Sequence, residues 1–260
     1  MANVHNTAIL TGDIELGDGV EVGPYCVLSG RIKIGNNTVL KSHVCVADNT
    51  IIGEGNIIYP FTSLGEVPQD KKFNNGETEL IIGNNNQIRE HVTINKGTEA
   101  GGGKTIIGSN NLIMSMTHIA HDCILGNKIV MSNGAMIAGH VVVEDNVIIG
   151  GMSGVHQFCK IGKGAMIGGM SAVRGHVIPF SLTKGDCVIG TNIIGLKRMQ
   201  YEKSDIRAIM EVINTLSRKQ SSMQTMVADF MKSENKFVQY IADFIKNSNS
   251  AVGLVHFDIS

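Results

Sequence analysis

The stretch IGSNNLIMSMTHIAHDCILGNKIVMSNGAMIAGHVVVEDNVIIGGMSGVHQFCKIGKGAMIGGMSAV (residues 107–173) repeats a six-residue pattern without interruption. An aliphatic residue opens each unit, and Gly, Asn, Asp or Ser often follows it, as in Gly108-Ser109-Asn110-Asn111. The same spacing extends outward to the N-terminus, and 25 of its 26 positions are Leu, Ile or Val. These positions are Val4, Leu10, Leu16, Val22, Leu28, Ile34, Leu40, Val46, Ile52, Ile58, Leu64, Ile82, Ile88, Ile94, Ile107, Ile113, Ile119, Leu125, Met131, Ile137, Val143, Ile149, Val155, Ile161, Ile167 and Val173.

A period of six matches neither an α-helix nor an ordinary alternating strand. It is typical of a short strand followed by a tight corner, with one inward side chain on each side. Gly, Asn and Asp suit such corners because they tolerate a positive φ. Three sides close a coil of 18 residues, and stacked coils hydrogen-bond as parallel strands about 4.8 Å apart. The repeat therefore predicts a β-solenoid.

The composition excludes several other classes of protein. The chain has 260 residues, 17% of them charged, and a formal net charge of −1, which argues against a nucleic-acid binder. No run of 18 apolar residues occurs, so we expect no membrane span. Residues 1–10 show no secretory signal. The five cysteines are widely spaced and form no CxxC pair, which favours reduced thiols in a cytoplasmic protein.

Two stretches interrupt the repeat, and the pattern ends near residue 180. Residues 66–79 (EVPQDKKFNNGETE) and 97–104 (GTEAGGGK) are predicted to be loops extruded from the coil. From Lys203 onward apolar residues recur at helical spacing, and two more amphipathic segments follow. We therefore expect a β-solenoid over residues 1–190 and a helical domain over residues 191–260 that covers its last coil.

Histidines gather on one face of the predicted solenoid, because residues 18 apart lie one above the other. This stacking places His121 over Gly139 and Asp122 over His140. It also brings His118, His156 and His176 to the same face or its corner.

This cluster is suited to general-base catalysis. A neutral histidine is the usual general base near pH 7, and a neighbouring carboxylate can orient it. A glycine beside the histidine leaves a backbone N–H accessible to an oxyanion. No Ser or Cys stands out as a nucleophile, so direct proton abstraction from a bound hydroxyl is the simpler chemistry. The alternative is a zinc site, for which His118, His121, His140 and His156 could supply three ligands.

At these residues the chain resembles a family, the acyl-[acyl-carrier-protein]–UDP-N-acetylglucosamine O-acyltransferases, which begin lipid A synthesis. The resemblance extends over nearly the whole chain. The stretches that carry it are LKSHV (40–44), GEVPQDKKF (65–73), HIAHDC (118–123), IAGHV (137–141), GGMSGVHQFC (150–159) and GLKR (195–198).

The resemblance implies specific roles in the transfer of a 3-hydroxyacyl chain to the sugar 3-hydroxyl. His121 would be the general base, Asp122 its partner, and the Gly139 amide the oxyanion donor. Gly169 matches the position that sets acyl length, where a glycine leaves room for a longer chain. The positions that match substrate contacts are Asp70, Lys72, His118, His140, His156, Gln157, Asn192 and Arg198.

The resemblance also implies the assembly and partners of the protein. The family fold is a left-handed parallel β-helix, and the family is trimeric, with sites between subunits. The implied partners are an acyl carrier protein with a 3-hydroxyacyl chain and UDP-N-acetylglucosamine, with no metal or other cofactor. Two alternatives remain open, a zinc-dependent β-helix enzyme of the carbonic anhydrase type and acyl transfer to a 3-amino UDP-sugar.

An acidic carrier protein requires basic residues on its partner. Residues 196–219 contain six basic and three acidic side chains, a local surplus of +3. The basic ones are Lys197, Arg198, Lys203, Arg207, Arg218 and Lys219. We therefore expect the first long helix of the C-terminal domain to meet the carrier.

Overall fold

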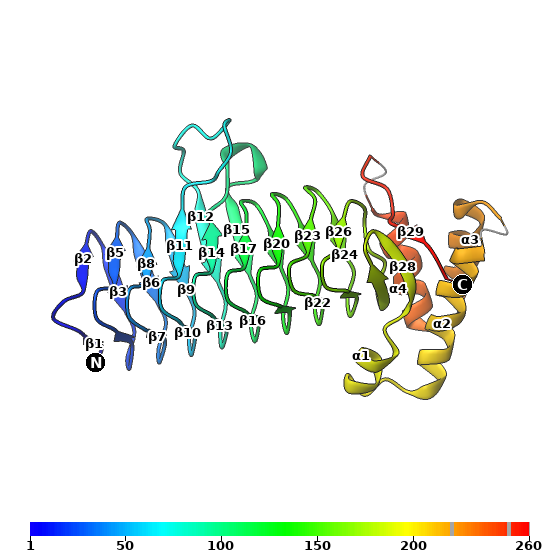
Figure 1. Ribbon diagram of the computed structural model, residues 1–260, viewed down its shortest axis with the longest axis horizontal. Coiled ribbons are helices and arrows are strands. Elements are labelled where there is room, and N and C mark those ends of the chain that lie inside the picture. The colour runs from blue at the N-terminus through cyan, green and yellow to red at the C-terminus, as the bar shows by residue number, and fades with distance from the viewer. Residues whose placement is uncertain (219–220, 249–250, 260) are drawn as a thin grey trace.

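The computed structural model describes residues 1–218, 221–248 and 251–259. The chain forms an elongated β-helix whose coils follow one another from the N-terminus, with helices at its C-terminal end (Figure 1). Among these residues three sheets form the sides of the coil, and strands β1 to β27 pair in parallel along each side.

Sheet A runs in the order β1 (Asn3–Val4), β4 (Glu21–Val22), β7 (Val39–Leu40), β10 (Ile57–Ile58), β13 (Gln87–Ile88), β16 (Leu112–Ile113), β19 (Val130–Met131), β22 (Ile148–Ile149), β25 (Met166–Ile167), β27 (Ser181–Lys184), β28 (Cys187–Thr191), β29 (His256–Phe257). Sheet B contains β2 (Ile9–Thr11), β5 (Val27–Ser29), β8 (Cys45–Val46), β11 (Ser63–Glu66), β14 (Thr93–Asn95), β17 (His118–Ile119), β20 (Met136–Ile137), β23 (Gly154–Val155), β26 (Ala172–Val173). Sheet C contains β3 (Ile14–Leu16), β6 (Ile32–Ile34), β9 (Thr50–Ile52), β12 (Glu79–Ile82), β15 (Lys104–Ile107), β18 (Ile124–Leu125), β21 (Val142–Val143), β24 (Lys160–Ile161).

The six-residue register matches the core. From Val22 to Val173 every position of the aliphatic repeat is buried, whereas Val4, at the open N-terminal end, is 40% exposed. Each side also has a second inward position, two residues before the aliphatic one. Small or polar residues such as Thr38, Asn56 and Ser153 are buried there. The expectation of one inward side chain per side was therefore wrong, because inward side chains alternate along each strand.

Both interruptions of the repeat lie outside the coil. The first loop joins β11 to β12 and the second joins β14 to β15, and they protrude on the same side of the molecule (Figure 1). The second contains the 3-10 helix η1 (Glu99–Gly101). The coil itself stays in register, since Ile52 pairs with Ile82 across the first loop.

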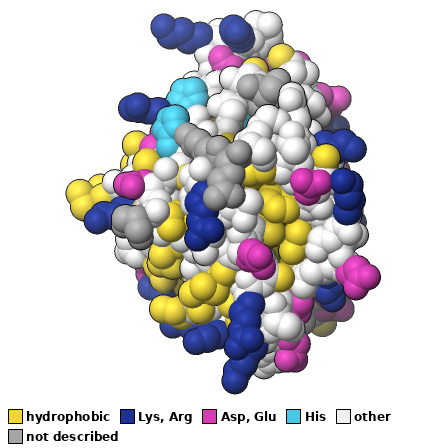
Figure 2. All heavy atoms as spheres, turned by 90° about the vertical axis from the view of Figure 1, so that its right-hand side faces the viewer, with side chains coloured by type: hydrophobic (Ala, Val, Ile, Leu, Met, Phe, Trp, Pro, Cys, Tyr) yellow, Lys and Arg dark blue, Asp and Glu magenta, His cyan; other side chains and the backbone are white. Residues whose placement is uncertain are grey.

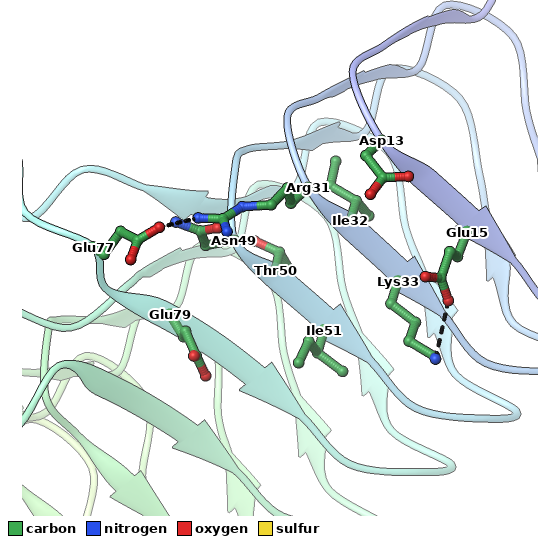
Figure 3. Close-up of a pocket in the computed structure, with 10 residues that line it drawn as sticks. All are labelled: Asp13, Glu15, Arg31, Ile32, Lys33, Asn49, Thr50, Ile51, Glu77 and Glu79. Atoms are coloured by element: carbon green, nitrogen blue, oxygen red, sulfur yellow. Dashed lines mark hydrogen bonds and ion pairs between the residues drawn. The ribbon is translucent and has the colours of Figure 1, made fainter.

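An ion pair ties the first loop to sheet C. Arg31 on the solenoid contacts Glu77 of the loop, and Lys33 pairs with Glu15 nearby at 3.0 Å (Figure 3). These groups line a charged depression of about 360 Å³ that contains no histidine. Because exposed ion pairs contribute little individually, we assign this surface to loop anchoring.

In the part of the chain that the structure describes, four α-helices follow the last coils. They are α1 (Ile193–Arg198), α2 (Lys203–Arg218), α3 (Met223–Phe230) and α4 (Lys236–Lys246). The apolar side of α2 buries Ile209, Ile213 and Leu216. Among the described residues, no helix is long and apolar enough to cross a membrane.

A hydrogen bond between residues far apart in the sequence connects helix α4 to the solenoid. Tyr240 of α4 donates to the Glu144 carboxylate at 2.5 Å, and Lys160 pairs with the same group at 2.9 Å. Burial and the Glu144 carboxylate both raise the pKa of the Tyr240 hydroxyl, which therefore stays protonated.

Replacing Tyr240 by Phe should lower the free energy of unfolding by about 1–2 kcal/mol, because a hydrogen bond to a charged group is lost. Urea denaturation followed by circular dichroism measures this. Tyr201→Phe is the control, since the Tyr201 hydroxyl makes no hydrogen bond to any residue that the structure describes. Equal unfolding midpoints for the two variants would contradict this assignment.

Candidate active site

A groove of about 480 Å³ lies on the outer face of sheet B, beside the two extruded loops. His118, His121, Gly139, His156 and Gln157 line it, all of them predicted from the sequence. Gln69 of the first loop and Asn95 at the end of β14 complete it. Sequence reasoning did not assign these two a role, although Gln69 lies inside the GEVPQDKKF motif that marked the first loop.

His121 lines the groove and forms a buried pair with Asp122. Nδ1 of His121 lies 2.8 Å from Oδ2 of Asp122, and the two side chains are 7% and 1% exposed. Since an ionised carboxylate only accepts hydrogen bonds, Nδ1 is the protonated nitrogen and Nε2 is left with its lone pair. Asp122 adopts φ 60°, a left-handed conformation that Asp tolerates better than most residues. The pair therefore has the arrangement of an oriented general base.

Gly139 lies directly against the His121 ring. A Cβ at this position would be 2.5 Å from Cε1 of His121, closer than any ordinary contact. The Gly139 N–H donates no hydrogen bond to any residue that the structure describes. The base thus has an unpaired backbone donor beside it, as an oxyanion site requires.

Two further histidines flank this centre in their neutral form. His118 Nδ1 lies 2.8 Å from the Thr93 hydroxyl, and the His140 ring stacks on Phe158 with centroids 4.5 Å apart. Burial lowers the pKa of both imidazoles, and His121 adds to this in each case, whereas the Asp122 carboxylate opposes the lowering of the His140 pKa. Both rings are therefore suited to hydrogen bonding rather than to charge pairing near pH 7.

Of the two polar residues predicted in the first loop, Asp70 lies near the groove and Lys72 does not line it. Asp70 lies close enough to His140 for its charge to oppose the lowering of the His140 pKa. The Asp70 carboxylate accepts a hydrogen bond from the Lys72 backbone N–H at 2.9 Å. Lys72 is exposed and does not line the groove in the single chain.

Three other predicted residues lie elsewhere in the single chain. Asn192 and Arg198 line a separate groove of about 420 Å³ on sheet A. The Asn192 side chain caps α1 by accepting from the Gly195 N–H at 3.0 Å, and it donates to the Gly164 carbonyl. Gly169 is exposed at a corner, where an added Cβ would make only an ordinary contact, 3.4 Å from the Gly151 carbonyl oxygen.

The placement of His176 in the histidine cluster was wrong. His176 is 2% exposed, and its Nδ1 accepts a hydrogen bond from the Lys160 backbone N–H at 2.9 Å. It pairs with Leu254 of the C-terminal segment in an isolated bridge. The 18-residue stacking rule fails here because the regular coil is ending.

One group of side chains in the described ranges has the spacing of metal ligands. Donor atoms of His121, Asp122 and His140 lie within 4.8 Å of one another. The Asp122 carboxylate already accepts hydrogen bonds from Thr98 N, Thr98 Oγ1 and His121 Nδ1. His118 and His156, expected in the zinc alternative, are not part of this group. A metal would have to displace these hydrogen bonds, so the donor set fits a hydrogen-bonded dyad better than a zinc site.

The chain is similar to known proteins over nearly its whole length. The chain is 45% identical over 242 residues to the acyl-[acyl-carrier-protein]–UDP-N-acetylglucosamine O-acyltransferase of Aliarcobacter butzleri, covering 92% of this chain and 93% of that protein. The enzyme of the same name from Herminiimonas arsenicoxydans is 45% identical over 91% of each chain. A family model described as UDP N-acetylglucosamine O-acyltransferase, domain 2, matches residues 177–255.

Solved structures show the same fold. The UDP-N-acetylglucosamine acyltransferase of Francisella novicida superposes with a TM-score of 0.94 at 36% identity, covering 98% of this chain and 94% of that one. The Acinetobacter baumannii LpxA structure gives a TM-score of 0.92 at 40% identity, with 97% and 99% covered. The fold is accordingly a left-handed parallel β-helix with a C-terminal helical domain. With these identities over nine-tenths of its length, the chain belongs to the acyl-[acyl-carrier-protein]–UDP-N-acetylglucosamine O-acyltransferase family.

Proposed function

We propose that this protein transfers a 3-hydroxyacyl chain from the thioester of acyl carrier protein to the 3-hydroxyl of UDP-N-acetylglucosamine, the first step of lipid A biosynthesis. The observation that carries the proposal is the buried His121–Asp122 pair with the unpaired Gly139 N–H beside it. The names of relatives that match nine-tenths of the chain support the same reaction and not the zinc alternative.

The geometry suggests a direct transfer without an acyl-enzyme. Nε2 of His121 removes the proton from the sugar 3-hydroxyl while the oxygen attacks the thioester carbonyl carbon. The Gly139 N–H stabilises the resulting oxyanion. Collapse of the tetrahedral intermediate breaks the carbon–sulfur bond, and the His121 imidazolium returns the proton to the departing thiolate. Asp122 stabilises the imidazolium between these two steps.

The remaining predicted residues are proposed to bind the substrates. His118, His140, His156 and Gln157 belong to the groove or its edge, and Asp70 and Lys72 belong to the loop beside it. Asn192 and Arg198 would contact the uridine diphosphate, and Gly169 would leave space for a long acyl chain.

A homotrimer would reconcile these assignments with the single chain. Asn192 and Arg198 of the α1 region line a groove beside sheet A, whereas His121 lines the groove on sheet B, so a ligand that contacts all three would bridge two subunits of the proposed trimer. The corner between sheets A and B also exposes a column of apolar side chains, which supports burial in an assembly. The column contains Tyr25, Phe61, Met116, Met152 and Met170, exposed by 58%, 53%, 68%, 68% and 85%. Light scattering should give a molar mass three times 27.9 kDa.

We further propose a cytoplasmic location. The structure supports it through its five cysteines, which are free thiols, with Cys26, Cys123 and Cys159 buried.

The reaction is tested by incubating the protein with a mixture of 3-hydroxyacyl carrier proteins and either UDP-N-acetylglucosamine or its 3-amino analogue. Mass spectrometry should detect an acylated nucleotide sugar from the hydroxyl acceptor and show which chain length is preferred. If only the 3-amino analogue is acylated, the acceptor is the 3-amino sugar and not UDP-N-acetylglucosamine. If a folded protein forms neither product, the proposed function is wrong.

The carrier protein is proposed to dock on the C-terminal helices. Arg207 and Arg218 on α2 are exposed, and Figure 2 shows basic side chains around the rim of this end of the molecule. Lys219, expected to take part, lies outside the described residues.

The double variant Arg207→Glu/Arg218→Glu should raise KM for the acyl carrier substrate about tenfold, because opposite charge is needed to attract an acidic partner. The KM for the nucleotide sugar should stay unchanged. Initial rates at varied carrier concentration measure this, and Lys33→Glu, at the opposite end, is the control. An unchanged carrier KM would exclude α2 as the docking surface.

A further inference from the structure

The second loop, residues 97–103, closes over the Asp122 carboxylate. The Thr98 backbone N–H donates to Oδ1 of Asp122 at 2.9 Å, and the Thr98 hydroxyl donates to Oδ2 at 2.6 Å. Thr98 is 4% exposed, so both bonds are protected from water. A single residue of an extruded loop thus binds both oxygens of the carboxylate that faces His121.

The loop is shaped for this close approach. A side chain on Gly101 would overlap the Asp122 carboxylate, so only glycine fits there. The Gly101 N–H donates to the Thr98 hydroxyl at 3.1 Å and so orients its proton toward Asp122. On the opposite side, the Asp122 backbone N–H donates to the Thr105 hydroxyl at 2.8 Å. The loop therefore fixes the Asp122 carboxylate, and sheet C fixes the Asp122 backbone.

His140 is a competing partner for the Asp122 carboxylate, which explains why the carboxylate must be fixed by Thr98. Oδ2 of Asp122 accepts from both Thr98 and His121, but His140 Nδ1 lies only 3.8 Å from the same oxygen. If the Thr98 hydroxyl were absent, rotation of the carboxylate could pair it with His140 instead. His121 would then lose the bond that keeps its proton on Nδ1 and its lone pair on Nε2.

We propose that Thr98 is a positioning residue for the reaction, which acts through Asp122 to fix the tautomer and orientation of His121. The proposal rests on the proposed function insofar as His121 is the general base. Thr98 touches no reacting atom. Its effect should therefore appear in turnover and not in substrate affinity.

Thr98→Val removes the hydroxyl and keeps the shape of the side chain. We expect kcat to fall roughly tenfold, because a hydrogen bond to a charged group is lost, while KM for both substrates stays within about twofold. Thr98→Ser should restore turnover to within about twofold of the original value. The matched control is Thr62→Val, which loses an equally buried hydroxyl that donates to the Tyr59 and Arg89 carbonyls. If Thr98→Val has the kcat of the unmodified protein, or loses no more than the control, the proposal is wrong.

A second readout does not depend on turnover. In protein labelled with ¹⁵N-histidine and free of substrate, the His121 side chain should show a protonated Nδ1 and an unprotonated Nε2. Thr98→Val should mix the two tautomers, whereas Thr98→Ser and Thr62→Val should not. If Thr98→Val folds poorly by circular dichroism, Thr98→Ala replaces it in both measurements. If the unmodified protein has no acyltransfer activity, the proposed function is wrong. If the His121 tautomer nevertheless depends on Thr98, the positioning role of Thr98 still holds. A tautomer that does not depend on Thr98 would overturn the positioning role.

Discussion

His121→Ala should lower turnover by about 10²-fold or more, because the variant loses the imidazole that takes the proton from the acceptor hydroxyl. The side chain is 7% exposed and its Nδ1 is committed to Asp122, so Nε2 is the nitrogen available for catalysis. The substitution removes a ring from the groove wall and none of the aliphatic core. The fold and the assembly should therefore be retained.

Initial rates with saturating substrates measure this effect, and light scattering checks the assembly. The control is His5→Ala, since His5 is exposed near the N-terminal end of the solenoid and does not line the groove. Turnover of the His121 variant near that of the control would exclude His121 as the base.

Gly139→Ala should lower turnover almost as much as His121→Ala, although it adds only a single methyl group. That methyl group would lie 2.5 Å from Cε1 and 2.7 Å from Nε2 of His121, so the ring or the backbone must move. A displacement of about 1 Å in a catalytic group costs roughly 10²-fold in rate, and the displaced N–H would also stabilise the oxyanion less well. We expect turnover to fall by about 10²-fold.

Gly154→Ala is the matched control in the same groove, because a Cβ there meets no atom within 4 Å. It should keep turnover within a few-fold of the unmodified protein. A crystal structure of the Gly139 variant should show the His121 ring displaced. Full activity with an undisplaced ring would contradict the role assigned to Gly139.

The solenoid could be predicted from the sequence because its period is local and strict. Every unit from Val22 to Val173 faces the core at the predicted position. The second inward position was missed because it holds mixed residues, Thr38 and Asn56 among them, which are satisfied by hydrogen bonds inside the coil. Periodicity of aliphatic residues cannot reveal a buried position that is polar.

The stacking rule also predicted that His121 lies against Gly139, and the structure confirms this contact at the candidate site. It failed for His176, where the chain turns into the antiparallel pair β27–β28 and the 18-residue offset ends. It also gave no signal for Thr98, because a polar residue in a glycine-rich loop has no periodic partner. Contacts made by extruded loops depend on the path of the loop, and this path is fixed only in the folded structure.

The most direct test of the central claim is a mass balance on a single reaction mixture. The protein is incubated with one 3-hydroxyacyl carrier protein and UDP-N-acetylglucosamine. Mass spectrometry then measures the molecular masses of the carrier, the nucleotide sugar and the protein at successive times. Direct transfer predicts that the nucleotide sugar gains the acyl mass at the rate at which the carrier loses it, while the mass of the protein stays constant. An acylated form of the protein that accumulates before product, or a carrier that loses its acyl group with no gain by the sugar, would contradict the account.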